Sequence, residues 1–451
     1  MGKPLIFHGA VIHSLSHTEL EVLESALLVV DGRGRIVAFN KNIADIPEDL
    51  GLPDHLNVRV GDCHIHKLER GTFLIPGFVD THNHAPQWAQ RGLGQGMHIL
   101  DWLDSVTFPN EARFADPEYA RRVYARCIDG FLKQGITTAS YYGSAHGEAT
   151  RILADICLEK GQRALVGKCN MDRNAPDYYR DANAEESIRV TEDCIRHIRE
   201  IDPESTLVKP VLTPRFAITC EPNLLQGLGK IAARELGLPI QTHFNEAEQE
   251  MQATRSLFPG FDNEVDLYHH YGLLGPRTIL AHCCYMNEYE MEKLVELDCG
   301  VAHCPVSNMT VGGGFMAAPV RKFLRRGIKV GLGTDSGGGF SSSILDAMRQ
   351  ALIASNAREA LTKGDDKGLT IGELFHLATL GGAKVCSLAD KVGNFAVDKE
   401  FDSCIISTLV TDQIMTVVEA EDSLMTVFEK FVMTGDDRNI TEVYVQGRRV
   451  K

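Results

Sequence analysis

Histidine and acidic residues recur at the ends of apolar runs in this chain, in types and spacings that suit a metal ion. His82 and His84 stand two residues apart, so on a β-strand both imidazoles project from the same face. Later apolar runs end at or contain His243, His282, His303 and Asp335. Imidazole nitrogens and a carboxylate together form a site suited to zinc, with iron also possible. The pattern predicts a metal site, and a catalytic one keeps one position open for water.

Glu246 follows His243 by three residues, close enough to assist a metal site and displaced enough not to need to ligate the ion. A carboxylate beside an activated water can take its proton, deliver it to a ring nitrogen and then to a leaving amine. His282 can orient the water or stabilise charge. Any one of these residues alone would more often have a structural role. Their occurrence together at the ends of successive apolar runs favours a catalytic site.

Eight β-like runs alternate with segments of helical periodicity. The runs are 73–84, 135–142, 163–171, 206–216, 238–246, 278–285, 300–308 and 329–335. Helical spacing of apolar residues marks the segments 223–236, 288–297, 320–326 and 343–361. Strand and helix in alternation predict parallel strands with crossover helices, and eight strands close a (β/α)₈ barrel. An open doubly wound sheet is the alternative. Barrel strands carry reactive groups at their C-terminal ends, where these histidines fall.

Both ends of the chain predict short strands. They are expected at 5–15, 26–30 and 35–39, with a turn at 31–34, and at 401–407 and 442–450. Isolated hairpins are marginal in water, so the two ends are expected to complete one small β domain. The expected division is residues 1–75 and 393–451 in that domain and residues 76–392 in the catalytic barrel.

Composition narrows the classes of partner. The 46 basic and 61 acidic residues give a net charge of −15, which counts against binding nucleic acid or an anionic membrane surface. Twelve cysteines without a C-x-x-C pair indicate reduced core thiols. No stretch approaches the roughly 20 apolar residues of a membrane span, and no leader pattern is seen. A cytoplasmic protein acting on a small neutral ligand is expected.

Two further histidine motifs favour other interpretations. His64-Ile65-His66 is followed by charged residues and lies outside the barrel pattern, so an exposed loop or edge strand is expected there. His146-Gly147-Glu148 matches the start of the nucleic-acid deaminase signature, but no Pro-Cys-x-x-Cys follows it. Neither motif contributes to the predicted site.

Longer motifs point to a known family. Residues 76–84 (PGFVDTHNH), His243, His282 and 333–335 (GTD) resemble the metal-dependent amidohydrolase superfamily, whose members carry a metallo-dependent hydrolase barrel and a small flanking β-sandwich. Within it, several blocks are similar to the guanine deaminase family and together cover essentially the whole chain. These blocks are 84–87 (HAPQ), 166–168, 171–172, 213–216 (TPRF), 303–305, 378–382 and 435–440.

The resemblance implies hydrolytic deamination of guanine to xanthine and ammonia, one zinc ion per subunit and a homodimer. Implied zinc ligands are His82, His84, His243 and Asp335. Glu246 would shuttle protons, with Asp335 and His282 activating or orienting the water. The implied substrate-binding positions are His84, Ala85, Pro86, Gln87, Arg215, Phe216, His243, Glu246 and Asp335. The sequence departs from the family pattern at 244–245, Cys283 and 336–337. These departures replace neither an implied zinc ligand nor Glu246, and they bear only on fine specificity.

Residue chemistry supplies an independent reason for guanine. Arg215 only donates hydrogen bonds, so it needs an acceptor, which guanine offers at its ring carbonyl while adenine presents an amino donor. Gln87 offers both donor and acceptor, and Phe216 offers apolar ring surface. Alternatively, Arg215 pairs with a loop carboxylate and Phe216 is core. The chain could also deaminate a pterin, a triazine or another nucleobase, or be a non-catalytic barrel that binds a partner protein.

Overall fold

A computed structural model describes residues 2–53, 58–312 and 314–451, and each of the eight predicted runs contains a strand. The principal strands are β6 (Phe78–His84), β7 (Ile136–Tyr142), β8 (Arg163–Gly167), β10 (Val208–Pro210), β12 (Ile240–Phe244), β13 (Thr278–His282), β14 (Gly300–His303) and β15 (Lys329–Leu332). They form two four-stranded parallel sheets, ordered β10-β8-β7-β6 and β12-β13-β14-β15. The short strands β9 (Cys169–Asn170) and β11 (Thr213–Pro214) follow β8 and β10 in the chain and pair with each other in parallel.

Hydrogen bonds cross both seams between the two sheets. On one side, Gln241 N donates to Leu212 O at 2.8 Å. On the other, Asp335 N donates to His82 O at 2.9 Å and Thr81 Oγ1 to Leu332 O at 2.8 Å. The eight strands therefore follow one another around a ring, and the expected mixed α/β architecture is confirmed.

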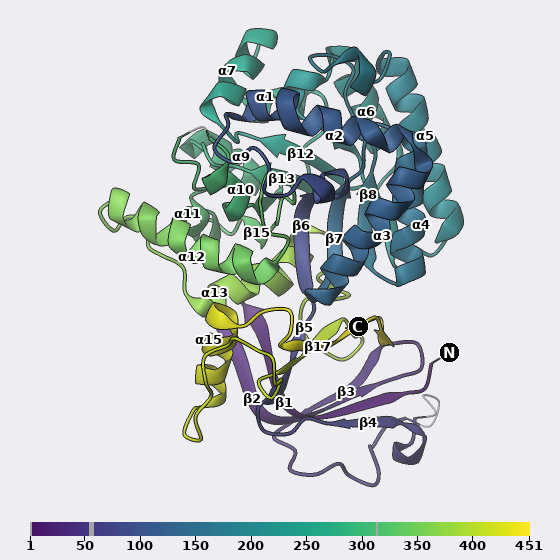
Figure 1. The fold of residues 1–451 in the computed structure, drawn as a ribbon, viewed down its shortest axis with the longest axis vertical. Coiled ribbons are helices and arrows are strands. Elements are labelled where there is room, and N and C mark those ends of the chain that lie inside the picture. The colour runs from purple at the N-terminus through teal and green to yellow at the C-terminus, as the bar shows by residue number, and fades with distance from the viewer. Residues whose placement is uncertain (1, 54–57, 313) are drawn as a thin grey trace.

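Helices surround these strands, as Figure 1 shows for α3 to α6 beside β7 and β8. The helices are α1 (Ile99–Trp102), α2 (Phe108–Ala112), α3 (Pro117–Lys133), α4 (Gly147–Lys160), α5 (Ala184–Ile201), α6 (Pro222–Arg234), α7 (Glu248–Leu257), α8 (Glu264–His270), α9 (Glu288–Glu296), α10 (Pro305–Thr310), α11 (Val320–Arg325), α12 (Ile344–Leu361), α13 (Ile371–His376), α14 (Gly382–Val385) and α15 (Leu424–Thr434). Local sequence explains their starts: Asp116, for example, caps α3 by accepting from Glu118 N at 2.9 Å, with Pro117 in the first turn. In the described part of the chain, no helix combines the length and apolarity needed to span a bilayer.

The two ends of the chain share one sheet, and both termini lie beside it in Figure 1. Its order is β18-β17-β16-β5-β1-β2-β3, with β4 beside β1. The strands are β1 (Leu5–Ser16), β2 (Glu19–Val30), β3 (Ile36–Lys41), β4 (His64–Lys67), β5 (Thr72–Pro76), β16 (Ser403–Ser407), β17 (Ile440–Val445) and β18 (Arg448–Arg449). Because β5 and β16 pair antiparallel, the expected joining of the two ends is confirmed. The domain boundaries at 75/76 and 392/393 stay predictions.

Two smaller expectations are also met. His64, Ile65 and His66 lie in the largely exposed strand β4, as expected of an edge position. All twelve cysteines are free and buried, in agreement with reduced core thiols.

A buried ion cluster joins the terminal sheet to the barrel. Arg163, the first residue of β8, contacts Asp402 at 3.0 and 3.1 Å and Glu400 at 2.6 Å. Asp402 also accepts from the backbone N of Gln446 at 2.8 Å. The guanidinium therefore ties a barrel strand to the segment that leads into β16.

Candidate active site

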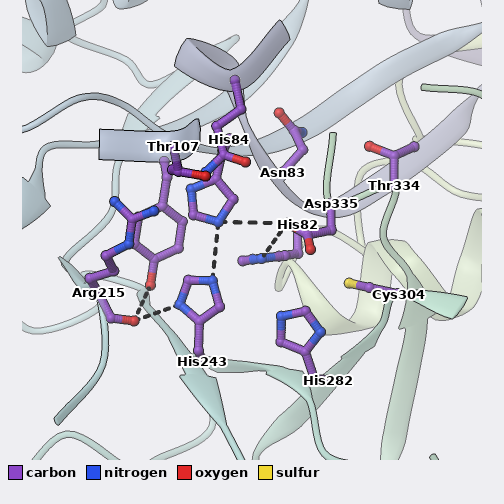
Figure 2. Close-up of polar contacts among 12 residues, drawn as sticks. His82, Asn83, His84, Thr107, Arg215, His243, His282, Cys304, Thr334 and Asp335 are labelled. Atoms are coloured by element: carbon purple, nitrogen blue, oxygen red, sulfur yellow. Dashed lines mark hydrogen bonds and ion pairs between the residues drawn. The ribbon is translucent and has the colours of Figure 1, made fainter. Parts of the chain in front are cut away.

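The predicted metal ligands converge at the C-terminal ends of their strands (Figure 2). His82 and His84 lie at the end of β6, His243 in β12 and His282 at the end of β13, and Asp335 follows β15. Each of the five side chains is buried. Residues that are far apart in sequence thus meet because parallel strands bring their carboxyl ends to one side.

Distances between the side chains are short enough for a shared ion. His84 Nε2 lies 3.1 Å from His243 Nε2, while Asp335 Oδ1 lies 3.4 Å from His82 Nε2 and 3.6 Å from His84 Nε2. Two overlapping sets can hold a metal, each with ligand atoms within 4.8 Å of one another: His82, His84 and His243, and His82, His282 and Asp335.

Neighbouring acceptors orient three of the imidazoles. His82 Nδ1 donates to Gln241 Oε1 at 2.6 Å, and His243 Nδ1 donates to Arg215 O at 2.6 Å. His282 Nδ1 donates to Asn308 Oδ1 at 2.7 Å. A ring nitrogen that faces a carbonyl oxygen must carry the proton, so the Nε2 lone pair of each ring faces the cluster.

The cluster has the electrostatics of a cation site. Burial lowers the pKa of His84 and of His243 well below the usual value, so both rings are neutral. Burial raises the pKa of Asp335, but the imidazoles that face it, His82 first, outweigh burial and lower this pKa well below its ordinary range. Neutral imidazoles at His84 and His243 and an ionised carboxylate at Asp335 are the protonation states that a metal requires. His82 Nε2 and His282 Nε2 are buried without a hydrogen-bond partner, as expected for atoms placed to bind an ion.

Backbone strain concentrates at the same strand ends. Asn245, His282 and Asp335 adopt φ values of 46°, 75° and 42°. Non-glycine residues rarely occupy this left-handed region, and such residues cluster at functional sites.

Glu246 lies beside the cluster, with Oε2 3.5 Å from His282 Nε2. Burial, followed by repulsion from Asp335, raises the pKa of Glu246 to about 8. A carboxyl group tuned near neutral pH can both accept and donate a proton.

A narrow cavity opens onto Glu246 and the cluster. Its lining residues are His84, Gln87, Ile99, Trp102, Leu103, Arg215, Phe216, His243, Glu246, Ser307, Val311 and Asp335. Seven of the nine predicted substrate-binding residues are therefore brought together. Ala85 and Pro86 are buried in the turn that places Gln87 and are not among the lining residues.

Several residues of the site carried no motif. Glu111, in α2, accepts hydrogen bonds from Arg215 Nη1 at 2.8 Å and from Gln87 Nε2 at 2.7 Å. The expected alternative of a carboxylate pairing with Arg215 is thus realised, yet Arg215 also lines the cavity. Ile99, Trp102, Leu103, Ser307 and Val311 complete the wall. A buried carboxylate cannot be identified from sequence until its cationic partner is known.

Comparisons with known proteins agree with this geometry. A model described as "Amidohydrolase family" matches residues 73–450. The chain is 40% identical to guanine deaminase of Rattus norvegicus over 451 residues, 99% of this chain and 96% of the relative. It is also 40% identical to a probable guanine deaminase of Schizosaccharomyces pombe over 445 residues, 99% of this chain and 83% of the relative. A crystal structure of guanine deaminase from C. acetobutylicum with bound guanine superimposes with a TM-score of 0.89 at 31% identity, covering 99% of this chain and 100% of that one. With the strand-end histidines and this full-length similarity, the chain belongs to the amidohydrolase family.

Proposed function

We propose that this protein hydrolyses guanine to xanthine and ammonia, using one zinc ion per subunit. The observation that carries the proposal is a single cavity that joins the imidazole cluster and Glu246 to a polar wall made by Arg215 and Gln87. Relatives named guanine deaminase over nearly the full chain support it.

The proposed zinc ligands are His82, His84, His243 and Asp335. Their fit rests on the unpartnered His82 Nε2 and on the Nε2 atoms of His84 and His243, which face one another across 3.1 Å. A bound zinc ion would supply Lewis acidity, which makes water a nucleophile near neutral pH.

The wall complements the edge of guanine that carries the carbonyl and the ring N–H. Glu111 takes one N–H from each terminal nitrogen of Arg215, so further guanidinium N–H groups remain to donate to the carbonyl. Gln87 Oε1 is buried without a partner and can accept from the ring N–H. Phe216 and Trp102 supply apolar surface for the ring faces.

Glu246 transfers the protons in this proposal, and His282 orients Glu246 and the water. Glu246 accepts a proton as the water oxygen bonds to the amino-bearing carbon, and it delivers that proton to the adjacent ring nitrogen. The carboxyl group then passes the second water proton to the amino group, the carbon–nitrogen bond breaks, and ammonia leaves. His282, whose Nδ1 is held by Asn308, keeps its Nε2 directed at Glu246 and the water.

Turnover by purified protein of known zinc content tests the proposal. Guanine loss and xanthine formation are followed by absorbance, with adenine, cytosine, a pterin and an amino-triazine as parallel substrates. Guanine-selective turnover is expected. Selective turnover of another amino-heterocycle would move the assignment to that substrate, and no turnover of any by zinc-loaded protein would leave only a binding role.

We further propose a homodimer in the cytoplasm. The location is supported by the twelve free buried thiols and the net charge of −15, which suit a reducing, aqueous compartment. Light scattering during gel filtration gives the molar mass, and a value for one chain would reject the dimer.

A further inference from the structure

We infer that Glu111 determines substrate specificity by fixing the hydrogen-bond pattern that Gln87 and Arg215 present to a purine. This inference rests on the proposed function, because it assigns a purine edge to that wall. Glu111 is a positioning residue here, since it does not line the cavity itself.

The Glu111 carboxylate is 1% exposed and is surrounded by donors. It accepts from Arg215 Nη1 at 2.8 Å and Nη2 at 3.2 Å, from Gln87 Nε2 at 2.7 Å and from Tyr179 OH at 2.5 Å. Four hydrogen bonds to one buried carboxylate hold the group in place from three chain segments.

This carboxylate decides which way the Gln87 amide points. An ionised carboxylate only accepts, so the amide nitrogen must face Glu111 and the amide oxygen must face away. Gln87 Oε1 is accordingly the atom left buried without a partner, on a residue that lines the cavity. Close packing restricts the amide further, because a Cβ at Gly337 would lie 2.2 Å from Gln87 Oε1.

The same carboxylate neutralises Arg215 before any ligand binds. Both partners are almost fully buried, and the paired charges leave this wall without net charge of its own. The wall then offers a donor from Arg215 beside an acceptor from Gln87. That order matches a ring carbonyl beside a ring N–H and mismatches adenine, whose amino group donates beside a ring nitrogen that accepts.

Glu111→Gln tests the inference with nearly unchanged shape. Calorimetry measures the dissociation constants of hypoxanthine, which has the carbonyl and ring N–H, and of purine, which lacks both. Neither ligand carries the amino group that is removed, so binding is measured without turnover. Wild-type protein is expected to prefer hypoxanthine, and the variant is expected to lower that preference by about 100-fold.

Tyr179→Phe is the matched control. It removes a donor to the same carboxylate but leaves Arg215 and Gln87 paired, so the preference should stay within about threefold of wild type. An unchanged preference in folded, zinc-loaded Glu111→Gln protein would overturn the inference, as would a wild type without any preference. Should Glu111→Gln fail to fold, Glu111→Asp keeps the charge but is one methylene too short for both partners. A partial loss is expected there, and full retention would refute the role.

The binding ratio is independent of guanine turnover. Wild-type protein that prefers hypoxanthine but does not deaminate guanine would defeat the proposed function and leave the role of Glu111 standing. If wild-type protein deaminates guanine and the Glu111→Gln variant keeps the wild-type preference for hypoxanthine over purine, the proposed function stands and the role of Glu111 is refuted.

Discussion

The backbone carbonyl of Arg215 accepts a 2.6 Å hydrogen bond from Nδ1 of His243, while the Arg215 side chain extends to Glu111 and the cavity. The same carbonyl accepts from the backbone N of His243 at 3.3 Å. One residue thus orients a proposed zinc ligand through its backbone and contacts the substrate cavity through its side chain, and the two roles are separable by substitution.

Arg215→Ala is expected to lower kcat/KM for guanine by about 100- to 1000-fold and to leave zinc stoichiometry unchanged. The backbone carbonyl that accepts from His243 survives the change, whereas the proposed donors to the purine do not. Steady-state kinetics and elemental analysis check both parts. Because the substitution leaves Glu111 without its cationic partner, the double variant Arg215→Met with Glu111→Leu is the control for that buried charge. Wild-type kinetics in either protein would contradict the binding role.

Glu246→Gln is expected to lower kcat by about 10²- to 10⁴-fold while zinc content and hypoxanthine affinity stay near wild type. The amide keeps the shape of the carboxyl group but cannot carry the proton. Glu250→Gln is the matched control, because Glu250 is a buried neighbour whose Oε2 accepts from Glu246 N at 3.3 Å and does not line the cavity. Equal losses in the two variants would show a structural effect in place of proton transfer.

Zinc-free protein is expected to lose stability between pH 6.5 and 8. The pKa of Glu246, raised to about 8 by burial and then by Asp335, means that the folded chain holds a proton which the unfolded chain releases near pH 4.5. Stability from this group therefore falls as pH rises to about 8. His84 and His243, whose pKa burial lowers, oppose this slope only below about pH 6.5, where unfolded histidine titrates.

Urea unfolding in the presence of a chelator, at pH 6.5 and 8, measures this slope. Wild-type protein should lose about 2 kcal/mol more than Glu246→Gln across that interval. Comparison with the variant cancels other groups, including Asp80, whose pKa burial raises to about 7. Identical pH dependence in the two proteins would show that Glu246 does not hold this proton.

Sequence predicted the part of the site that depends on strand ends. Each proposed ligand follows an apolar run, and the period of two places His82 and His84 on one face, so topology alone brings them to His243 and Asp335. The runs at 206–216 and 300–308 overestimated strand length: the structure has 208–210, 213–214 and 300–303 there, because the ends turn into loops and α10.

Residues that act through a neighbour were not predictable. Glu111, Gln241 and Asn308 are common polar types without a motif, and each matters only because folding places it against Arg215, His82 or His282. Trp102 and Leu103 were missed for a similar reason, since their short helical segment has too few residues to show a period and covers the cavity only in the folded chain.

His84→Ala is expected to lose most bound zinc, whereas His303→Ala should keep it. Both residues are buried at the C-terminal ends of barrel strands that flank β15, but only His84 belongs to a ligand set with atoms within 4.8 Å. Zinc per chain after dialysis against a weak chelator gives the answer, and added zinc should raise the melting temperature of His303→Ala but not of His84→Ala. Equal zinc loss in both would mean that the cluster is not the binding site.

Arg163→Met is expected to destabilise the protein by about 3 to 5 kcal/mol without changing kcat/KM for guanine at low temperature. The guanidinium is buried against Asp402 and Glu400, so its removal leaves Asp402 without a cationic partner and leaves Glu400 with Lys391 alone, at 3.6 Å. Arg163 begins β8 at the end opposite to the cavity, which explains why activity should persist. Thermal unfolding and kinetics measure the two effects, with Arg196→Met as the control, because Arg196 pairs with Asp193 on an exposed helix face. A stability equal to that of the control would show that this cluster does not hold the two parts of the chain together.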